Sequence, residues 1–136
     1  MEHAGIKAVI NLQTQDEMDE MAINWQNQMK EYRSHGIDVA MHYPVNNKDA
    51  DYKEKVFMAA QYLHGLIDKQ SKKVFIHCSS GLIRTPTVVL TYLCIFKRVK
   101  TWKNISATRD FMTECCSKSM PKVAIVEQIV QENKKF

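Results

Sequence analysis

Hydrophobic and polar positions change along the chain in a pattern that predicts strands and helices in turn. Three short apolar runs are typical of strands because they are rich in β-branched residues and are bounded by polar or turn-forming residues. They cover residues 6–13, 37–45 and 73–77. The last run is apolar without alternation, which favours a strand buried on both faces.

Longer stretches repeat apolar residues at helical spacing and predict helices between and after these strands. A helix or helical region is expected over residues 16–36, closed by Gly36, and an amphipathic helix over about 51–69. Three further helices should complete the chain. We expect them over about 85–98, 101–116 and 121–134, with Pro86 and Pro121 in the first turns of the first and the third.

This order of elements predicts the α/β class: a central, mostly parallel sheet flanked by helices. With 136 residues, the chain is expected to form one domain. In parallel sheets of this kind, ligands bind beyond the carboxyl ends of the strands. Residues that follow the three strand runs are therefore the first candidates for a functional site.

Composition narrows the classes of function that we consider. The net charge is +4, and the Lys and Arg residues are scattered, which fits an anionic substrate better than a nucleic acid. No apolar run reaches the ~18 residues that would span a membrane, and no signal peptide is evident, so we expect a cytoplasmic protein. The four cysteines are irregularly spaced, which argues for reduced thiols. The histidines share no spacing, so we expect neither a metal nor a cofactor.

The stretch KKVFIHCSSGLIRT, residues 72–85, carries the clearest chemistry. A strand delivers Cys78 to its carboxyl end, and a helix that begins near Arg84 turns its positive N-terminus toward the intervening loop. Backbone N–H groups of this loop can converge on a tetrahedral oxyanion, with a glycine that permits the turn. The predicted phosphate-binding residues are Ser79, Ser80, Gly81, Leu82, Ile83 and Arg84.

These residue types match phosphate-ester cleavage through a thiol. Cys78 stands where a helix N-terminus and a cation would favour the reactive thiolate. The guanidinium of Arg84 can bind two phosphate oxygens at once, which lysine cannot do. Thr85 follows the arginine, and its hydroxyl could bond the sulfur or help to expel it in a second step.

The motif HCSSGLIRT resembles the His-Cys-x5-Arg-Ser/Thr signature of the cysteine-dependent protein tyrosine phosphatase superfamily, and the wider pattern resembles its compact dual-specificity branch. The segments GIKAVINLQT and YRSHGIDVAMHYPV are also similar to laforin and the plant glucan phosphatases. The resemblance implies hydrolysis of phosphate monoesters through a cysteinyl-phosphate, without a metal. It also implies that His77 orients the loop and supports the thiolate.

Three departures from the family pattern bear on activity. The family protonates the leaving oxygen with an aspartate about thirty residues before the cysteine, and here Asn47 occupies that position; Asp49 or Asp51 could serve if the loop is shifted. Ile83 stands where a small or polar residue is usual. Family domains also begin with about thirty more residues that add strands, so the chain is expected to be an N-terminally truncated domain or to have its sheet edge covered by a partner chain.

Two functions are therefore expected as alternatives. The first is a phosphatase that acts on a phosphoprotein (Tyr, Ser or Thr) or a similar phosphate monoester, with Cys78 and Arg84 as catalytic residues and Asp49 as the candidate acid. The second is a weak or inactive pseudophosphatase that binds phosphorylated partners or serves as a structural subunit. Neither alternative involves a nucleic acid or a membrane span.

Overall fold

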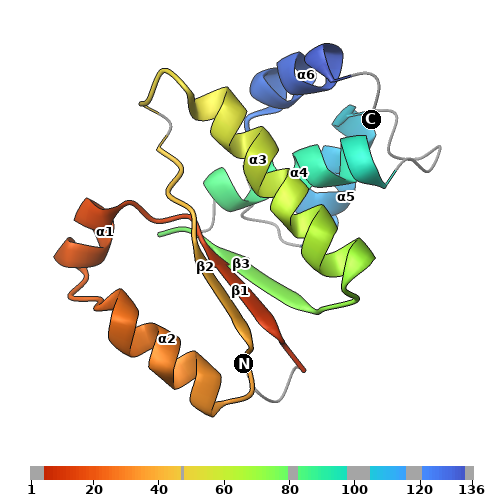
Figure 1. Cartoon of the computed structure of the whole chain (residues 1–136). Coiled ribbons are helices and arrows are strands. Elements are labelled where there is room, and N and C mark those ends of the chain that lie inside the picture. The colour runs from red at the N-terminus through yellow and green to blue at the C-terminus, as the bar shows by residue number, and fades with distance from the viewer. Residues whose placement is uncertain (1–4, 47, 80–82, 98–104, 116–120, 134–136) are drawn as a thin grey trace.

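The computed structural model describes residues 5–46, 48–79, 83–97, 105–115 and 121–133. Its sheet contains β1 (Ala8–Asn11), β2 (Val39–His42) and β3 (Val74–His77), in the order β2-β1-β3. Both pairings are parallel, so the predicted α/β fold with a parallel sheet is confirmed. Figure 1 shows the three strands side by side at the centre of the molecule.

The three strands differ in burial. All four residues of β1 are buried, because this strand has a neighbour on each side and packed helices on both faces. The expectation of a buried strand over 73–77 is wrong: no residue of β3 is buried, and Phe75 is 38% exposed. Among the described strands β3 pairs with β1 alone, which leaves its other edge and part of one face accessible.

The helical region expected over 16–36 is two helices, α1 (Gln15–Glu20) and α2 (Trp25–Ser34). The chain turns between them, where Ala22 adopts a left-handed φ of 55°. The side chain of Asn24 then accepts a hydrogen bond from the Asn27 N–H and starts the second helix. Helical periodicity did not predict this break, because apolar residues recur at helical spacing in both helices and across the turn between them.

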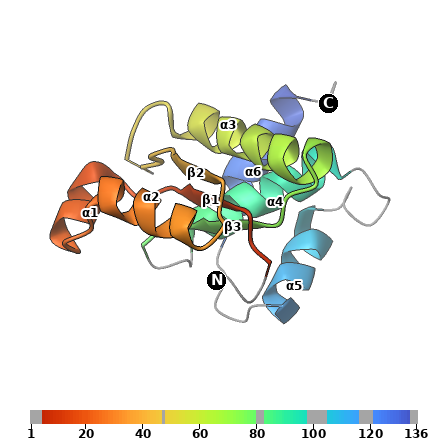
Figure 2. The same cartoon turned by 60° about the horizontal axis from the view of Figure 1, so that its bottom comes forward.

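The remaining helices match the expected ones within a few residues. They are α3 (Tyr52–His64), continued by the π-helical turn η2 (Gly65–Lys69), then α4 (Arg84–Phe96), α5 (Ile105–Cys115) and α6 (Val123–Glu132). Figures 1 and 2 show α1 and α2 on one side of the sheet and the later helices on the other. No helix within the described ranges is both long and apolar enough to cross a bilayer.

The larger part of the core lies between the sheet and the later helices. Ile10 and Leu12 come from β1 and its end, Val56 from α3, and Val88 from α4; all four are fully buried. A smaller cluster around Val9, on the opposite face, packs against α2. Burying apolar surface on both faces fixes β1 in the middle of the sheet.

The strand register sets the position of the candidate site. Asn11 at the end of β1 lies opposite His42 of β2 and His77 of β3, so the three strands end at the same level. The described residues that follow them, 12–14, 43–46 and 78–79, therefore lie at one edge of the sheet.

Candidate active site

The structure places Cys78 and Arg84 on either side of one loop, as the sequence predicts. Cys78 directly follows β3 and is 7% exposed, and Arg84 is the first residue of α4. Ile83 immediately precedes the helix, and its carbonyl oxygen accepts hydrogen bonds from the N–H (2.9 Å) and the hydroxyl (2.6 Å) of Thr87. Ser80, Gly81 and Leu82 lie outside the described residues, so their predicted phosphate contacts stay predictions.

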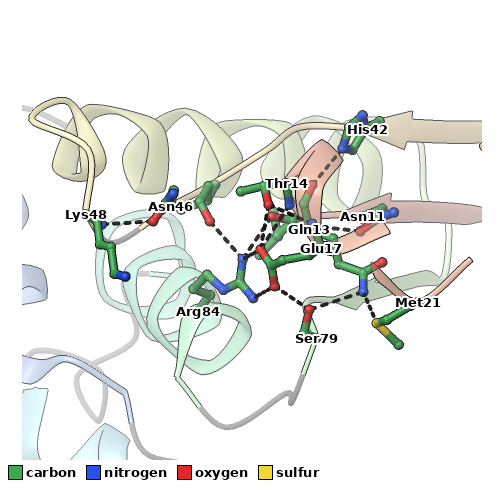
Figure 3. A network of polar contacts seen from close by, with 12 residues as sticks. Asn11, Gln13, Thr14, Glu17, Met21, His42, Asn46, Lys48, Ser79 and Arg84 are labelled. Carbon is green, nitrogen blue, oxygen red and sulfur yellow. Dashed lines mark hydrogen bonds and ion pairs between the residues drawn. The ribbon is translucent and has the colours of Figure 1, made fainter. Parts of the chain in front are cut away.

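The guanidinium of Arg84 is held by groups from the other two strand ends (Figure 3). Its Nη1 and Nη2 atoms donate to Oε1 and Oε2 of Glu17, at 2.6 and 2.5 Å. Nη1 also donates to the carbonyl oxygen of Val45 (3.1 Å) and lies 3.5 Å from that of Leu12. The Arg84 side chain is only 14% exposed. A bidentate ion pair of this kind orients both charged groups strongly.

The carboxylate of Glu17 has further donors. The backbone N–H and the hydroxyl of Thr14 both donate to Oε1, each at 3.1 Å, and the hydroxyl of Ser79 donates to Oε2. The Arg84 hydrogen bonds, followed by those from Ser79 and Thr14, lower the pKa of Glu17 to about 2, against the opposing effect of burial. Glu17 is therefore an anion throughout the neutral range.

Gln13 links the end of β1 to the signature loop. Gln13 is buried, with 2% of the residue exposed, and its side-chain Nε2 donates to the Ser79 hydroxyl at 3.3 Å. Its backbone N–H donates to Asn11 Oδ1 (2.8 Å), and its carbonyl oxygen lies 2.6 Å from Nε2 of His42. The segment that carries Gln13 and Glu17 is thus fixed to both neighbouring strands.

Buried polar atoms without hydrogen-bond partners gather around the same loop. Within the described residues these side-chain atoms include Gln13 Oε1, His77 Nε2 and Thr85 Oγ1. Leaving such an atom unpaired costs about 1–3 kcal/mol, so folded proteins contain few of them. Their concentration beside Cys78 and Arg84 is typical of a ligand-binding site rather than of a core.

His77 directly precedes Cys78 and Thr85 directly follows Arg84, and their supporting roles stay predictions. Burial lowers the pKa of His77, although a hydrogen bond with the Cys78 backbone opposes this effect, so the ring is mostly neutral at pH 7. The His77 ring also stacks on Phe75, with centroids 5.2 Å apart. The Thr85 hydroxyl is buried and unpaired, so its predicted bond to the Cys78 sulfur is not formed in this structure.

The side chains of the candidate proton donors after β2 have fewer and longer contacts than those of Arg84 and Glu17. Asn47 lies outside the described residues. Asp49 is 45% exposed, and its carboxylate lies 3.9 Å from Nζ of Lys55, which is also 3.9 Å from the carboxylate of Asp51. Asp51 precedes α3 but makes no side-chain capping bond. Both carboxylates thus lie near Lys55, in contacts too long and too exposed to fix their orientation.

Comparison with known proteins adds the family. The model of the dual specificity phosphatase catalytic domain matches residues 1–135. The chain belongs to the dual specificity phosphatase family. The mouse dual specificity protein phosphatase 26 is 29% identical over 65 residues, which cover 41% of this chain and 31% of that protein. The match thus spans about a third of that relative's length.

Several solved structures have a similar fold. Kinase associated phosphatase, in a form whose catalytic-site cysteine is replaced by serine, has a TM-score of 0.73 at 17% identity and covers 98% of this chain and 72% of that one. The human tyrosine phosphatase-like serine/threonine/tyrosine-interacting protein has a TM-score of 0.67 at 17% identity, covering 98% and 80%. At these identities the likeness shows the fold alone.

Sequence reasoning missed Glu17 and Gln13. A signal for Glu17 was present, because Thr14-x-x-Glu17 has the spacing of a capping box, and both capping bonds are made. The box follows the central strand and thus lies at the carboxyl edge of the sheet, next to the loop after β3. Only the sheet order reveals that this carboxylate reaches an arginine 67 residues away.

Proposed function

We propose that the protein is a cysteine-dependent dual-specificity phosphatase, which hydrolyses phosphate monoesters of phosphoproteins (Tyr, Ser or Thr) or of similar substrates. The observation that carries this proposal is the oriented guanidinium of Arg84, at the N-terminus of α4 and across one loop from the buried Cys78. An arginine fixed in this way presents a planar, permanent charge where a phosphoryl group would lie beside the sulfur.

The reaction proceeds in two displacements at phosphorus. The thiolate of Cys78 attacks, forming the S–P bond while the ester P–O bond breaks, and the leaving oxygen takes a proton from an acid of the segment after β2 or, for a phenolate, from solvent water. Water then attacks the cysteinyl-phosphate, the S–P bond breaks, and inorganic phosphate and the thiolate are released. Arg84 and the N–H groups of the loop stabilise the charge on the equatorial oxygens in both steps. Neither step calls for a metal.

The nature of the leaving group separates good substrates from poor ones. An alkoxide needs a proton donor, whereas a phenolate leaves with much less assistance. If Asn47 stands at the acid position, the protein lacks a donor there, because an amide does not release a proton at neutral pH. We therefore propose that aryl phosphates, including phosphotyrosine, are turned over faster than phosphoserine or phosphothreonine.

Single-turnover kinetics test this function directly. An aryl phosphate mixed with excess protein should release its phenol in a fast phase, and an alkyl phosphate should react more slowly. Cys78→Ser should abolish the fast phase while leaving the protein folded. If the wild-type rate equals that of Cys78→Ser with either substrate, the enzyme proposal is wrong, and retained binding of a phosphopeptide would then favour the pseudophosphatase alternative.

A further inference from the structure

We propose that Glu17 is a positioning residue: it orients the Arg84 guanidinium and, through Ser79, ties together the two ends of the phosphate-binding loop. This inference rests on the proposed function, since it assigns the support of the same anion site. The evidence is the network of Figure 3, in which one carboxylate from α1 contacts the residue after Cys78 and the first residue of α4.

The two edges of the guanidinium have different partners. The edge formed by Nη1 and Nη2 faces Glu17, and the remaining N–H of Nη1 points to the carbonyl oxygen of Val45. Between the described residues, Arg84 makes its hydrogen bonds through Nη1 and one N–H of Nη2, and none involves Nε–H or the second N–H of Nη2, which form the neighbouring edge. That edge carries two parallel N–H bonds, the arrangement that binds two oxygens of a phosphate.

The edge that Glu17 occupies shows whether it supports phosphate binding by Arg84 or competes with the phosphate. A carboxylate that mimicked the substrate would occupy the edge needed for phosphate, and it would have to leave before an anion could bind. Glu17 instead occupies the adjacent edge and uses only one of the two N–H groups of Nη2, so both can bind Arg84 together. Glu17 is also fixed by the capping box with Thr14, which holds its side chain against the start of α1.

Ser79 extends the same support to the other end of the loop. Its hydroxyl donates to Glu17 Oε2 and accepts from Gln13 Nε2 at 3.3 Å. The residue after the nucleophile and the arginine six positions after the nucleophile thus share one carboxylate. The distance between the two loop ends is set before a substrate binds, which reduces the ordering cost of binding.

Titration calorimetry with orthovanadate tests the proposal on the intact chain without relying on turnover. Glu17→Gln should bind vanadate at least about tenfold more weakly than wild type, because the guanidinium loses its charged support. Asp19→Asn is the matched control, since it removes an exposed carboxylate from the same helix, and it should bind like wild type. Glu17→Asp keeps the charge but is shorter, so it should be intermediate.

The Arg84→Lys background separates positioning from a general loss of structure. If Glu17 acts through the guanidinium, Glu17→Gln should weaken vanadate binding much less in that background than in wild type. Should Glu17→Gln fail to fold, Glu17→Asp replaces it in the same comparison. Equal losses in both backgrounds would contradict positioning.

Other outcomes are equally clear. Unchanged affinity in Glu17→Gln, or in Glu17→Asp if only that variant folds, would refute the positioning role. Tighter binding would refute it too, because it would make Glu17 a competitor of the anion. Suppose that wild type binds vanadate and hydrolyses aryl phosphates, but the Glu17 variant binds vanadate as tightly as wild type or more tightly. The positioning role of Glu17 then fails, and the proposed function stands. If wild type binds no vanadate and hydrolyses nothing, the proposed function fails as well.

Discussion

The two halves of the candidate site differ in how firmly they are built. The anion-binding half joins the ends of β1 and β3, where Glu17 and Arg84 form a bidentate ion pair that is mostly shielded from water. The proton-donating half is the segment after β2, where Asp49 is 45% exposed and lies 3.9 Å from Lys55. A surface pair at that distance contributes little to orientation, whereas the half-buried, bidentate pair of Glu17 and Arg84 orients both partners.

This difference teaches that anion binding and proton transfer can be separated within one site. The anion-binding half depends on Glu17 and Arg84, which stabilise each other without a substrate. The proton-donating half depends on one side chain in a surface loop, and we expect its substitution to change the free energy of unfolding little. We therefore expect that a chain of this family can keep the support of its arginine while its acid step varies, and that each half can be changed by itself.

The largest effect should follow from breaking the anion-binding half. Arg84→Lys keeps the charge but loses the fork geometry, so kcat/KM for an aryl phosphate should fall by about 100-fold or more. The matched control is Arg33→Lys at the exposed end of α2, which should leave the rate unchanged. A similar rate in both variants would reduce Arg84 to the first residue of a helix.

The next effect should come from building the proton-donating half. If Asn47 occupies the acid position, Asn47→Asp should raise kcat for an alkyl phosphate by about tenfold or more and that for an aryl phosphate less. If Asp49 is the acid instead, Asp49→Asn should remove the basic limb of the pH–rate profile, and Asn47→Asp should change little. Steady-state kinetics with both substrates across pH distinguishes these cases.

A smaller effect is expected in thiol reactivity. Burial raises the pKa of Cys94 to about 11, although a hydrogen bond with Thr108 opposes this effect, so its thiol stays protonated at pH 7. Cys78 should react with iodoacetate several-fold faster than Cys94, because thiolates are the reactive species and the anion site attracts the reagent. Vanadate should protect Cys78. Mass spectrometry of the alkylated peptides measures both rates, and equal rates would argue against an assembled site.

The smallest effect concerns stability at acid pH. The lowered pKa of Glu17, about 2 against 4.5, means that its ion pair stabilises the fold fully above about pH 4.5. This contribution should be lost as pH falls from 4.5 toward 2. Chemical denaturation at several pH values should thus show a steeper loss for wild type than for Glu17→Gln, with Asp19→Asn resembling wild type. Parallel curves for wild type and Glu17→Gln would contradict the coupling.

Much of this protein was predictable from local patterns. The parallel α/β fold, the strand before Cys78 and the helix that begins at Arg84 depend on neighbouring residues, whose periodicity and turn chemistry act over short distances. The break of the first helical region near Ala22 was not predicted, because helical spacing continues through it. The exposure of β3 was not predicted either, since an apolar run does not say how many neighbours its strand has.

The sequence by itself determined the signature motif, because its cysteine, glycine, arginine and threonine lie within eight consecutive residues, between one strand and one helix. The tertiary structure alone decided what supports that loop. Glu17 and Arg84 are 67 residues apart and meet only because β1 lies beside β3 and both end at the same level. Strand order is set by burial over the whole chain, and no local pattern contains it.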